Sequence, residues 1–176
     1  MDIPRSIFLV GLMAVGKTTI GRLLAQSLGM QFLDSDHEIE NRAGADTSWI
    51  FEREGEAGFR DREEAVIDDL TQRTNVVLAT GGGAVLRAAN RRLLAERGVV
   101  IHLDSPVDRI VERTAKDRKR PLLQNGDPRE TLTNLMRMRG PLYEEIRHYR
   151  FVTDRQSPKA LTRNIEETLR RDGLIL

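Results

Sequence analysis

Short apolar runs alternate with longer amphipathic stretches along this chain. The short runs have the length and the aliphatic content of buried strands, and they cover residues 6–10, 31–33, 76–79, 99–103 and 150–152. Such alternation is typical of a parallel sheet with crossover helices. The pattern therefore predicts an α/β fold of three layers, with a five-stranded parallel sheet flanked by helices. It does not reveal the order of the strands.

Helix signals fill the intervals between these runs. Residues 17–28 place Ile20, Leu24 and Leu28 at helical spacing. Later helix starts are indicated by a capping side chain followed by proline, a residue favoured at the first helical position. These pairs are Ser105-Pro106, Asp127-Pro128 and Ser157-Pro158. By contrast, the Arg139-Gly-Pro sequence is expected to follow the end of a helix.

Two segments depart from the simple alternation. Residues 34–75 are too long for one crossover helix and rich in charge, which predicts an inserted helical subdomain. Residues 115–126 are polar, basic and interrupted by proline and glycine, a composition that indicates a loop of the kind that often forms a lid. We expect a single domain over residues 1–176, with a core of 1–33, 76–114 and 127–176.

Composition narrows the class of protein further. The chain has 39% hydrophobic and 31% charged residues, no cysteine and a formal charge of +1. Disulfides and thiolate chemistry are excluded, and a near-neutral chain is a poor candidate for binding nucleic acid. No apolar run approaches the ~20 residues that cross a bilayer, and no signal peptide is visible. These features predict a cytoplasmic protein that binds no membrane.

The strongest motif is Gly11-Leu-Met-Ala-Val-Gly16-Lys17-Thr18, which lies between the first predicted strand and the first predicted helix. It matches the P-loop pattern, whose backbone N–H groups surround phosphates at a helix N-terminus. In that pattern the lysine reaches the β- and γ-phosphates and the hydroxyl ligates Mg²⁺. The predicted ATP-binding residues of this loop are Gly11, Ala14, Val15, Gly16, Lys17, Thr18 and Thr19.

Other features narrow the type of P-loop protein. The Asn-Lys-x-Asp segment of signalling GTPases is missing, and the third strand leads into Gly81-Gly82-Gly83 instead of an acidic residue. Glycines allow close approach of a ligand to the backbone, although a tight turn alone would also explain some of them. Asp34 and Asp36 follow the second strand, where α/β proteins bind ligands, although a helix N-cap is the simpler reading.

Taken in order, the motifs resemble the shikimate kinase family over nearly the whole chain. They are the P-loop, Phe32-Leu-Asp34-Ser-Asp36, Gly55-Glu-Ala-Gly58-Phe59-Arg60, Gly81-Gly82-Gly83, Arg120-Pro-Leu-Leu and Arg139-Gly-Pro-Leu-Tyr143. The resemblance implies a nucleoside monophosphate kinase-like fold with a substrate-binding subdomain, 34–75, and a lid, 115–126. It also implies transfer of the ATP γ-phosphate to the 3-hydroxyl of shikimate, which gives shikimate 3-phosphate and ADP on the route to chorismate and aromatic amino acids.

The resemblance assigns the acceptor side of the site. Asp36 would contact the shikimate hydroxyls and serve as the candidate base, or only orient the attacking hydroxyl. Arg60 and Arg139 would bind the substrate carboxylate, and Gly81, Gly82 and Gly83 would line the same site. Read without the family, Arg60 is an ordinary helix-surface arginine. Arg137 would face elsewhere on a helix and serves as an internal control.

The resemblance also assigns the nucleotide side. Lys17 and Arg120 would act on the phosphates, and Arg120 would reach them as the lid closes. Mg²⁺ would be held by Thr18 and, through water, by Asp34. Arg155 and Gln156 would touch adenine. Arg113 is equally an exposed helix residue or a guanidinium stacked on the base.

Two alternative functions of the same fold are a gluconate-type sugar-acid kinase and a nucleotide-binding regulator without catalysis. We expect ATP and shikimate as partners and a monomer. Ala14 and Thr18 stand where relatives often have glycine and serine. His37, His102 and His148 have no metal-ligand spacing and are expected to be structural, and Trp49 is expected to pack within the subdomain.

Overall fold

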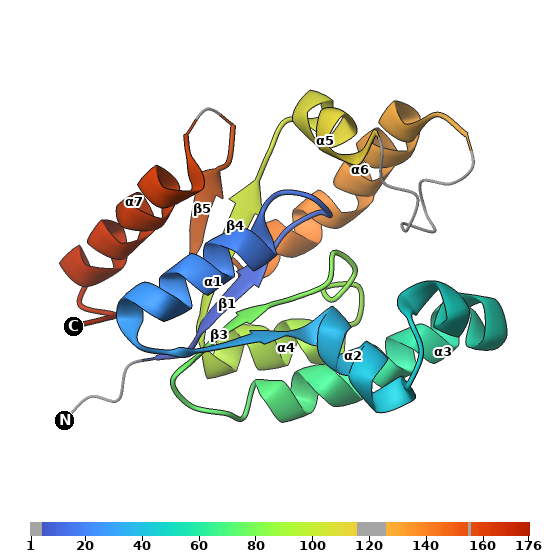
Figure 1. Cartoon of the computed structure of the whole chain (residues 1–176), viewed down its shortest axis with the longest axis horizontal. Helices are drawn as coiled ribbons and strands as arrows, with labels where there is room; N and C mark the ends of the chain where they lie inside the picture. The colour runs from blue at the N-terminus through green and yellow to red at the C-terminus, as the bar shows by residue number, and fades with distance from the viewer. Residues whose placement is uncertain (1–4, 116–125, 155) are drawn as a thin grey trace.

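The fold is built around one parallel sheet (Figure 1). The computed structural model describes residues 5–115, 126–154 and 156–176. Within them the strands follow the order β2-β3-β1-β4-β5, and every neighbouring pair is parallel. The strands are β1 (Ile7–Val10), β2 (Gln31–Asp34), β3 (Val76–Ala79), β4 (Val99–Asp104) and β5 (Tyr149–Val152). The predicted fold class is confirmed, and the predicted strand ends agree to within one residue.

Helices cover both faces of the sheet. They are α1 (Lys17–Leu28), α2 (Ser35–Ala43), α3 (Thr47–Leu70), α4 (Ala88–Arg97), α5 (Val107–Thr114), α6 (Pro128–Ile146) and α7 (Pro158–Arg171). Helices α1 and α7 pack together over one face, whereas the carboxyl half of α3, with α4 and α6, lies over the other (Figure 1). The segment predicted to be helical, 34–75, contains α2 and α3, and these two helices pack against each other.

The central strands are the most buried part of the molecule. All four residues of β1 and of β3 are buried, as are the first five residues of β4. Strands with helices on both faces read as continuous apolar runs, which is why their sequences show no polar alternation. From β1 the chain crosses to one side of the sheet and later returns to the other. The carboxyl end of β1 is therefore at a topological switch point, where open α/β sheets bind ligands.

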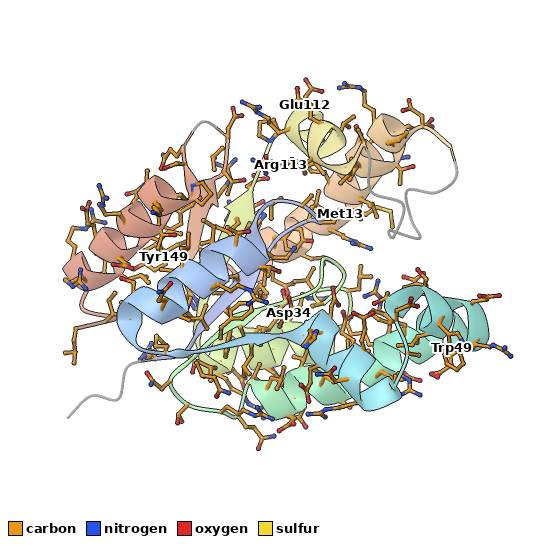
Figure 2. All side chains as sticks on the ribbon, viewed as in Figure 1. Met13, Asp34, Trp49, Glu112, Arg113 and Tyr149 are labelled. Carbon is orange, nitrogen blue, oxygen red and sulfur yellow. The ribbon has the colours of Figure 1, made fainter. Side chains whose placement is uncertain are left out.

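A glycine interrupts α3. Gly55 has φ 73° and ψ 179°, a region that only glycine adopts readily, and it separates a first segment from the longer run that ends at Leu70. The expectation that Trp49 packs within this region is wrong: its side chain is 46% exposed at the outer end of α3 (Figure 2). Ile50, which is fully buried, and the Phe51–Phe59 ring pair form the local core instead.

Two of the three predicted proline starts are confirmed, since Asp127 and Ser157 accept backbone hydrogen bonds as N-caps of α6 and α7. At α5 the N-cap is Pro106, one residue later than predicted. Asp104 accepts a hydrogen bond from the Ser105 N–H, so the serine is held in the preceding turn.

The expected helix end before Arg139 is wrong, because α6 continues through Pro141 to Ile146. Burial of Leu132, Tyr143 and Ile146 on one face of α6 outweighs the local cost of proline.

In the described ranges, no helix combines the length and the apolar character that a membrane crossing requires.

Candidate active site

Two glycines shape the loop between β1 and α1. Gly11 has φ 150° and Gly16 has φ 102°. A Cβ at Gly11 would lie 2.3 Å from the carbonyl oxygen of Leu103, so no other residue fits there without movement of the backbone. Gly16 is the N-cap of α1 and has no side chain to satisfy the first helical N–H groups. The loop is therefore ready to receive an anion at the helix N-terminus.

Lys17 lies over this loop. Its Nζ donates to the carbonyl oxygens of Gly11, at 2.5 Å, and of Leu12, at 2.7 Å. Its positive charge also lowers the pKa of Asp36, which places the two side chains within electrostatic reach of each other. The ammonium group is thus positioned between the P-loop backbone and the carboxylate that follows β2.

Asp34 joins β2 to the P-loop (Figure 2). Its Oδ2 accepts from the Thr18 hydroxyl at 3.1 Å, and its Oδ1 accepts from the His37 N–H at 3.1 Å as the N-cap of α2. The capping role and the contact with Thr18 therefore coexist. Hydroxyl and carboxylate oxygens suit Mg²⁺. Among the described residues, no group of three or more His, Cys, Asp or Glu side chains is placed to hold a metal ion, so an ion at Thr18 and Asp34 would also need phosphate or water oxygens.

Asp36 lies in the first turn of α2, beside Gly81. Burial raises the pKa of its carboxyl from 3.8 to about 6, and the negative charges of Glu63 and Asp34 add to that shift. Lys17 and Arg60 oppose it. A carboxylate whose pKa lies just below neutral pH is ionised in the cell and still able to accept a proton.

The Arg60 side chain is buried inside the site. It is 8% exposed and forms a 2.8 Å hydrogen bond through Nη1 to Glu63, which is fully buried. The ordinary reading of Arg60 as a solvated surface residue is therefore wrong. Its Nε and the Glu63 Oε2 have no hydrogen-bond partner in the described part of the chain. Burial raises the pKa of Glu63, and the Arg60 charge opposes that rise.

Arg139 approaches from the opposite side, on α6. It is only 4% exposed, and burial lowers the pKa of its guanidinium, as does the nearby positive charge of Arg60. Across the described ranges Arg139 forms no ion pair with a carboxylate. The charges of Glu56 and Glu63 offset part of the repulsion between the two buried cations, and an anion bound between the guanidinium groups would offset more of it. Arg137, on the same helix, is exposed.

The triple glycine lies against these three side chains. A Cβ at Gly81 would be 2.5 Å from Asp36 Oδ1, one at Gly82 would be 3.4 Å from Arg139 Nη1, and one at Gly83 would be 2.3 Å from Arg60 Nη2. Each glycine therefore leaves room for one charged group. The backbone N–H groups of Gly82 and Gly83 donate to no acceptor among the described residues. This turn presents free donors beside two arginines and a carboxylate.

A cavity of about 550 Å³ lies beside the P-loop and reaches the first two glycines of the turn. It is lined by the P-loop from Met13 to Thr19, by Asp34 and Asp36, and by Gly81 and Gly82. Arg113 and Gln156 also line it. Arg113 donates to the carbonyl oxygens of Ala14 and Thr153, each at 3.0 Å, and so joins the P-loop to the segment after β5.

The structure thus brings most of the sequence-predicted residues together at the carboxyl edge of the sheet. Arg120, most of the predicted lid and Arg155 lie outside the described residues. Sequence reasoning missed Glu63 as the buried partner of Arg60, although an acid three residues along a helix is a recognisable signal. It also gave no role to Tyr143, whose hydroxyl donates to the Gly82 carbonyl.

Comparisons with known proteins point to one family. The family model for shikimate kinase matches residues 13–170. The shikimate kinase of Actinobacillus pleuropneumoniae serotype 5b (strain L20) is 57% identical over 165 residues, which covers 94% of this chain and 95% of the relative. That of Pasteurella multocida (strain Pm70) is 55% identical over 166 residues, covering 94% and 95%. The structure of shikimate kinase from Acinetobacter baumannii in complex with shikimate superposes with a TM-score of 0.93 at 48% identity, covering 96% of this chain and 94% of that one.

Proposed function

The chain belongs to the shikimate kinase family, and we propose that it transfers the γ-phosphate of ATP to the 3-hydroxyl of shikimate, giving shikimate 3-phosphate and ADP. This is a step toward chorismate and the aromatic amino acids. One observation in this chain carries the proposal: Arg60 and Arg139 are both buried beside Asp36, next to a phosphate-binding loop. A polyhydroxylated carboxylic acid fits that combination of charges.

The substrate carboxylate is the proposed ligand of Arg60 and Arg139. Arg139 has no carboxylate partner among the described residues, and Arg60 has an unused Nε donor. A carboxylate between the two guanidinium groups would relieve their repulsion and accept paired hydrogen bonds. The free N–H groups of Gly82 and Gly83 would add further donors from the turn. This arrangement would favour an acid over a neutral polyol.

Asp36 is proposed to act on the attacking hydroxyl. Its pKa of about 6 leaves most of the carboxylate ionised at neutral pH, so it can accept a hydrogen bond from the hydroxyl and then its proton. Because phosphoryl transfer passes through a loose transition state, the orientation of the hydroxyl matters at least as much as removal of its proton. Burial, together with the negative charges of Glu63 and Asp34, keeps the pKa raised and so keeps Asp36 a useful base.

Lys17 and Arg120 are proposed to stabilise the transferred phosphoryl group. Lys17 exchanges its contacts with the Gly11 and Leu12 carbonyls for phosphate oxygens when ATP binds. Arg120 belongs to the predicted lid, 115–126, and its part in closure is a proposal from the sequence alone. The roles of 34–75 as substrate-binding subdomain and of the remainder as core are proposals of the same kind.

Thr18 and Asp34 would hold Mg²⁺, Asp34 through water. Their oxygens are 3.1 Å apart, and hard oxygen donors of this type suit the ion. When bound, Mg²⁺ would neutralise charge on the β- and γ-phosphates. Gln156, Arg155 and Arg113 are proposed to bind the adenine end of ATP. Arg113 already bonds two backbone carbonyls, which holds its guanidinium in place at the cavity's edge.

The decisive experiment measures ADP release from ATP and Mg²⁺ with shikimate, quinate, gluconate or no acceptor. We expect release to depend on shikimate and to be far slower with the other acceptors. Equal rates with and without shikimate would refute the proposal, and preference for gluconate would favour a sugar-acid kinase. ATP binding without turnover on any acceptor would indicate a regulator. A monomer in the cytoplasm remains a prediction, which light scattering and cell fractionation would check.

A further inference from the structure

Tyr143 forms the shortest side-chain contact to the triple glycine. Its hydroxyl donates to the Gly82 carbonyl oxygen at 2.5 Å, across 61 positions of sequence. The side chain is 2% exposed and lies on the buried face of α6. Burial raises the pKa of this phenol, so the hydroxyl keeps its proton and remains a donor. The hydrogen bond is partly shielded from solvent, so its loss would weaken the hold on the Gly82 carbonyl.

Two side chains of α6 reach Gly82 together. Arg139 and Tyr143 are one helical turn apart, so they share a face of the helix. A Cβ built on Gly82 would lie 3.4 Å from Arg139 Nη1, while the Gly82 carbonyl meets the Tyr143 hydroxyl. Helix α6 thus holds the turn through Tyr143 and, at the same point, carries Arg139, the proposed ligand of the substrate carboxylate.

The Tyr143 ring is itself held in place. It stacks on the His102 ring with centroids 4.8 Å apart and an interplanar angle of 27°. His102 is 5% exposed, and burial lowers its pKa to about 4, so the imidazole is neutral at physiological pH. His102 belongs to β4, which pairs with β1 just before the P-loop. Hence the phenol hydroxyl is anchored to the sheet as well as to α6.

Peptide geometry transmits this contact to the acceptor site. In a trans peptide the carbonyl of one residue points opposite to the N–H of the next, and no cis bond occurs in the described chain. The direction of the Gly82 carbonyl therefore determines the direction of the Gly83 N–H. That N–H has no acceptor in the described ranges. Gly83 is buried, and a Cβ built on it would lie 2.3 Å from Arg60 Nη2. An acceptor oxygen bound by Arg60 would therefore lie close to this N–H.

We propose that Tyr143 is a positioning residue for the acceptor: by holding the Gly82 carbonyl it aims the Gly83 N–H into the site that Arg60 and Arg139 enclose. The identity of the acceptor as shikimate rests on the proposed function. The hold of Tyr143 on the turn does not, because it is a property of the protein alone.

The variant Tyr143→Phe keeps the ring and removes only the hydroxyl, which donates to the Gly82 carbonyl and also contacts the Arg139 side chain. The chain offers a matched control, because its second tyrosine, Tyr149, donates to Asp172 Oδ2 at 2.6 Å beside α7, away from the P-loop (Figure 2). In Tyr143→Phe we expect the KM for shikimate to rise about tenfold, with the KM for ATP changed less than twofold. Tyr149→Phe is expected to leave both constants unchanged. An equal rise in both constants, or none in either, would overturn the proposal.

A second measurement separates this inference from the proposed function. Amide resonances of the ligand-free protein, recorded by NMR, report the Gly83 N–H directly. We expect the Gly83 resonance to shift or broaden, and its hydrogen exchange to quicken, in Tyr143→Phe but not in Tyr149→Phe. If these changes occur while the parent protein releases no more ADP with shikimate than without it, the proposed function is wrong. The contact of Tyr143 with the turn is then still supported. An unchanged Gly83 resonance would refute that hold even in an active enzyme.

Discussion

The two halves of the cleft are built in opposite ways. The nucleotide half, residues 11–18 with Asp34, is made largely of backbone from one continuous loop, and Thr18 at its helix end is exposed. The acceptor half comprises Asp36, Arg60, residues 81–83 and Arg139, which come from separate elements and rely on buried charge. A phosphate site can therefore be specified by one short stretch of sequence. A site for a small acid, by contrast, needs side chains that the fold brings together from distant parts of the chain.

The two halves also differ in energetic cost. Backbone donors at a helix N-terminus cost little to leave in water. In the acceptor half, burial raises the pKa of Asp36 and Glu63 and lowers that of Arg139, so each charge there is held against desolvation. A site of this kind lowers the free energy of unfolding of the ligand-free protein, but its charged groups are already in place when the substrate binds. We therefore expect substitutions in the acceptor half to separate activity from stability most clearly.

The largest effect is expected for Asp36→Asn. Loss of the carboxylate should lower kcat by about 10²–10⁴, because the attacking hydroxyl loses its orienting acceptor. The same variant should be more stable than the parent, since the buried charge disappears. Initial rates and urea unfolding would measure the two quantities. Asp46→Asn, at the exposed cap of α3, is the control and should change neither. A destabilised Asp36→Asn would contradict the idea of costly buried charge.

The pH dependence follows from the same carboxyl group. Its pKa is 3.8 in the ordinary case and about 6 in the folded chain, so folding takes up a proton between these pH values. The stabilisation linked to Asp36 is therefore full below pH 3.8 and is lost, by about 3 kcal/mol, as pH rises through 6. Activity has the opposite slope: kcat/KM should fall tenfold per pH unit below 6. Asp36→Asn should remove this part of the stability profile.

Arg139→Ala should have the next largest effect. Loss of paired, charge-assisted hydrogen bonds to the substrate carboxylate is expected to raise the KM for shikimate about a hundredfold, with little change in the KM for ATP. Arg137→Ala is the matched control, two residues away on the exposed face of α6. If both variants raise the shikimate KM equally, Arg139 acts through general positive charge and the proposed contact is wrong.

Gly81→Ala tests whether this position of the turn must lack a side chain. The added methyl would come within 2.5 Å of Asp36 Oδ1, so the carboxylate has to move. We expect kcat to fall about tenfold, a smaller loss than removing the group, with the protein still folded. Gly140→Ala is the control, because outside its chain neighbours and its own helix no atom lies within 4 Å of the added Cβ, and it should leave kcat unchanged. Unaltered kcat in Gly81→Ala would mean that Asp36 adapts without loss.

This contrast also explains what the sequence could predict. The central strands, the P-loop and the caps at Asp127 and Ser157 depend on neighbours within a few residues, and all were predicted. The burial of Arg60 against Glu63, and the continuation of α6 through Pro141, depend on packing between distant elements. The spacing of three residues could suggest that Arg60 pairs with Glu63, but a local pattern does not show that the pair is buried. The family motifs pointed to Arg60 and Arg139, but not to the charge balance that surrounds them.

The smallest effect is expected in the nucleotide half, at Ala14. This residue has φ 61°, a left-handed conformation that costs a non-glycine residue about 1 kcal/mol or more. Its carbonyl accepts from Arg113, which helps to hold the conformation. Ala14→Gly relieves the strain but loosens the unfolded chain, so we expect a net stabilisation of only about 0.5 kcal/mol and a KM for ATP within twofold of the parent. Because Arg113 bonds a backbone oxygen, that contact survives the change. A rise of tenfold in the KM for ATP would show that the Ala14 methyl group itself supports the loop, and the nucleotide half would then depend on side chains as the acceptor half does.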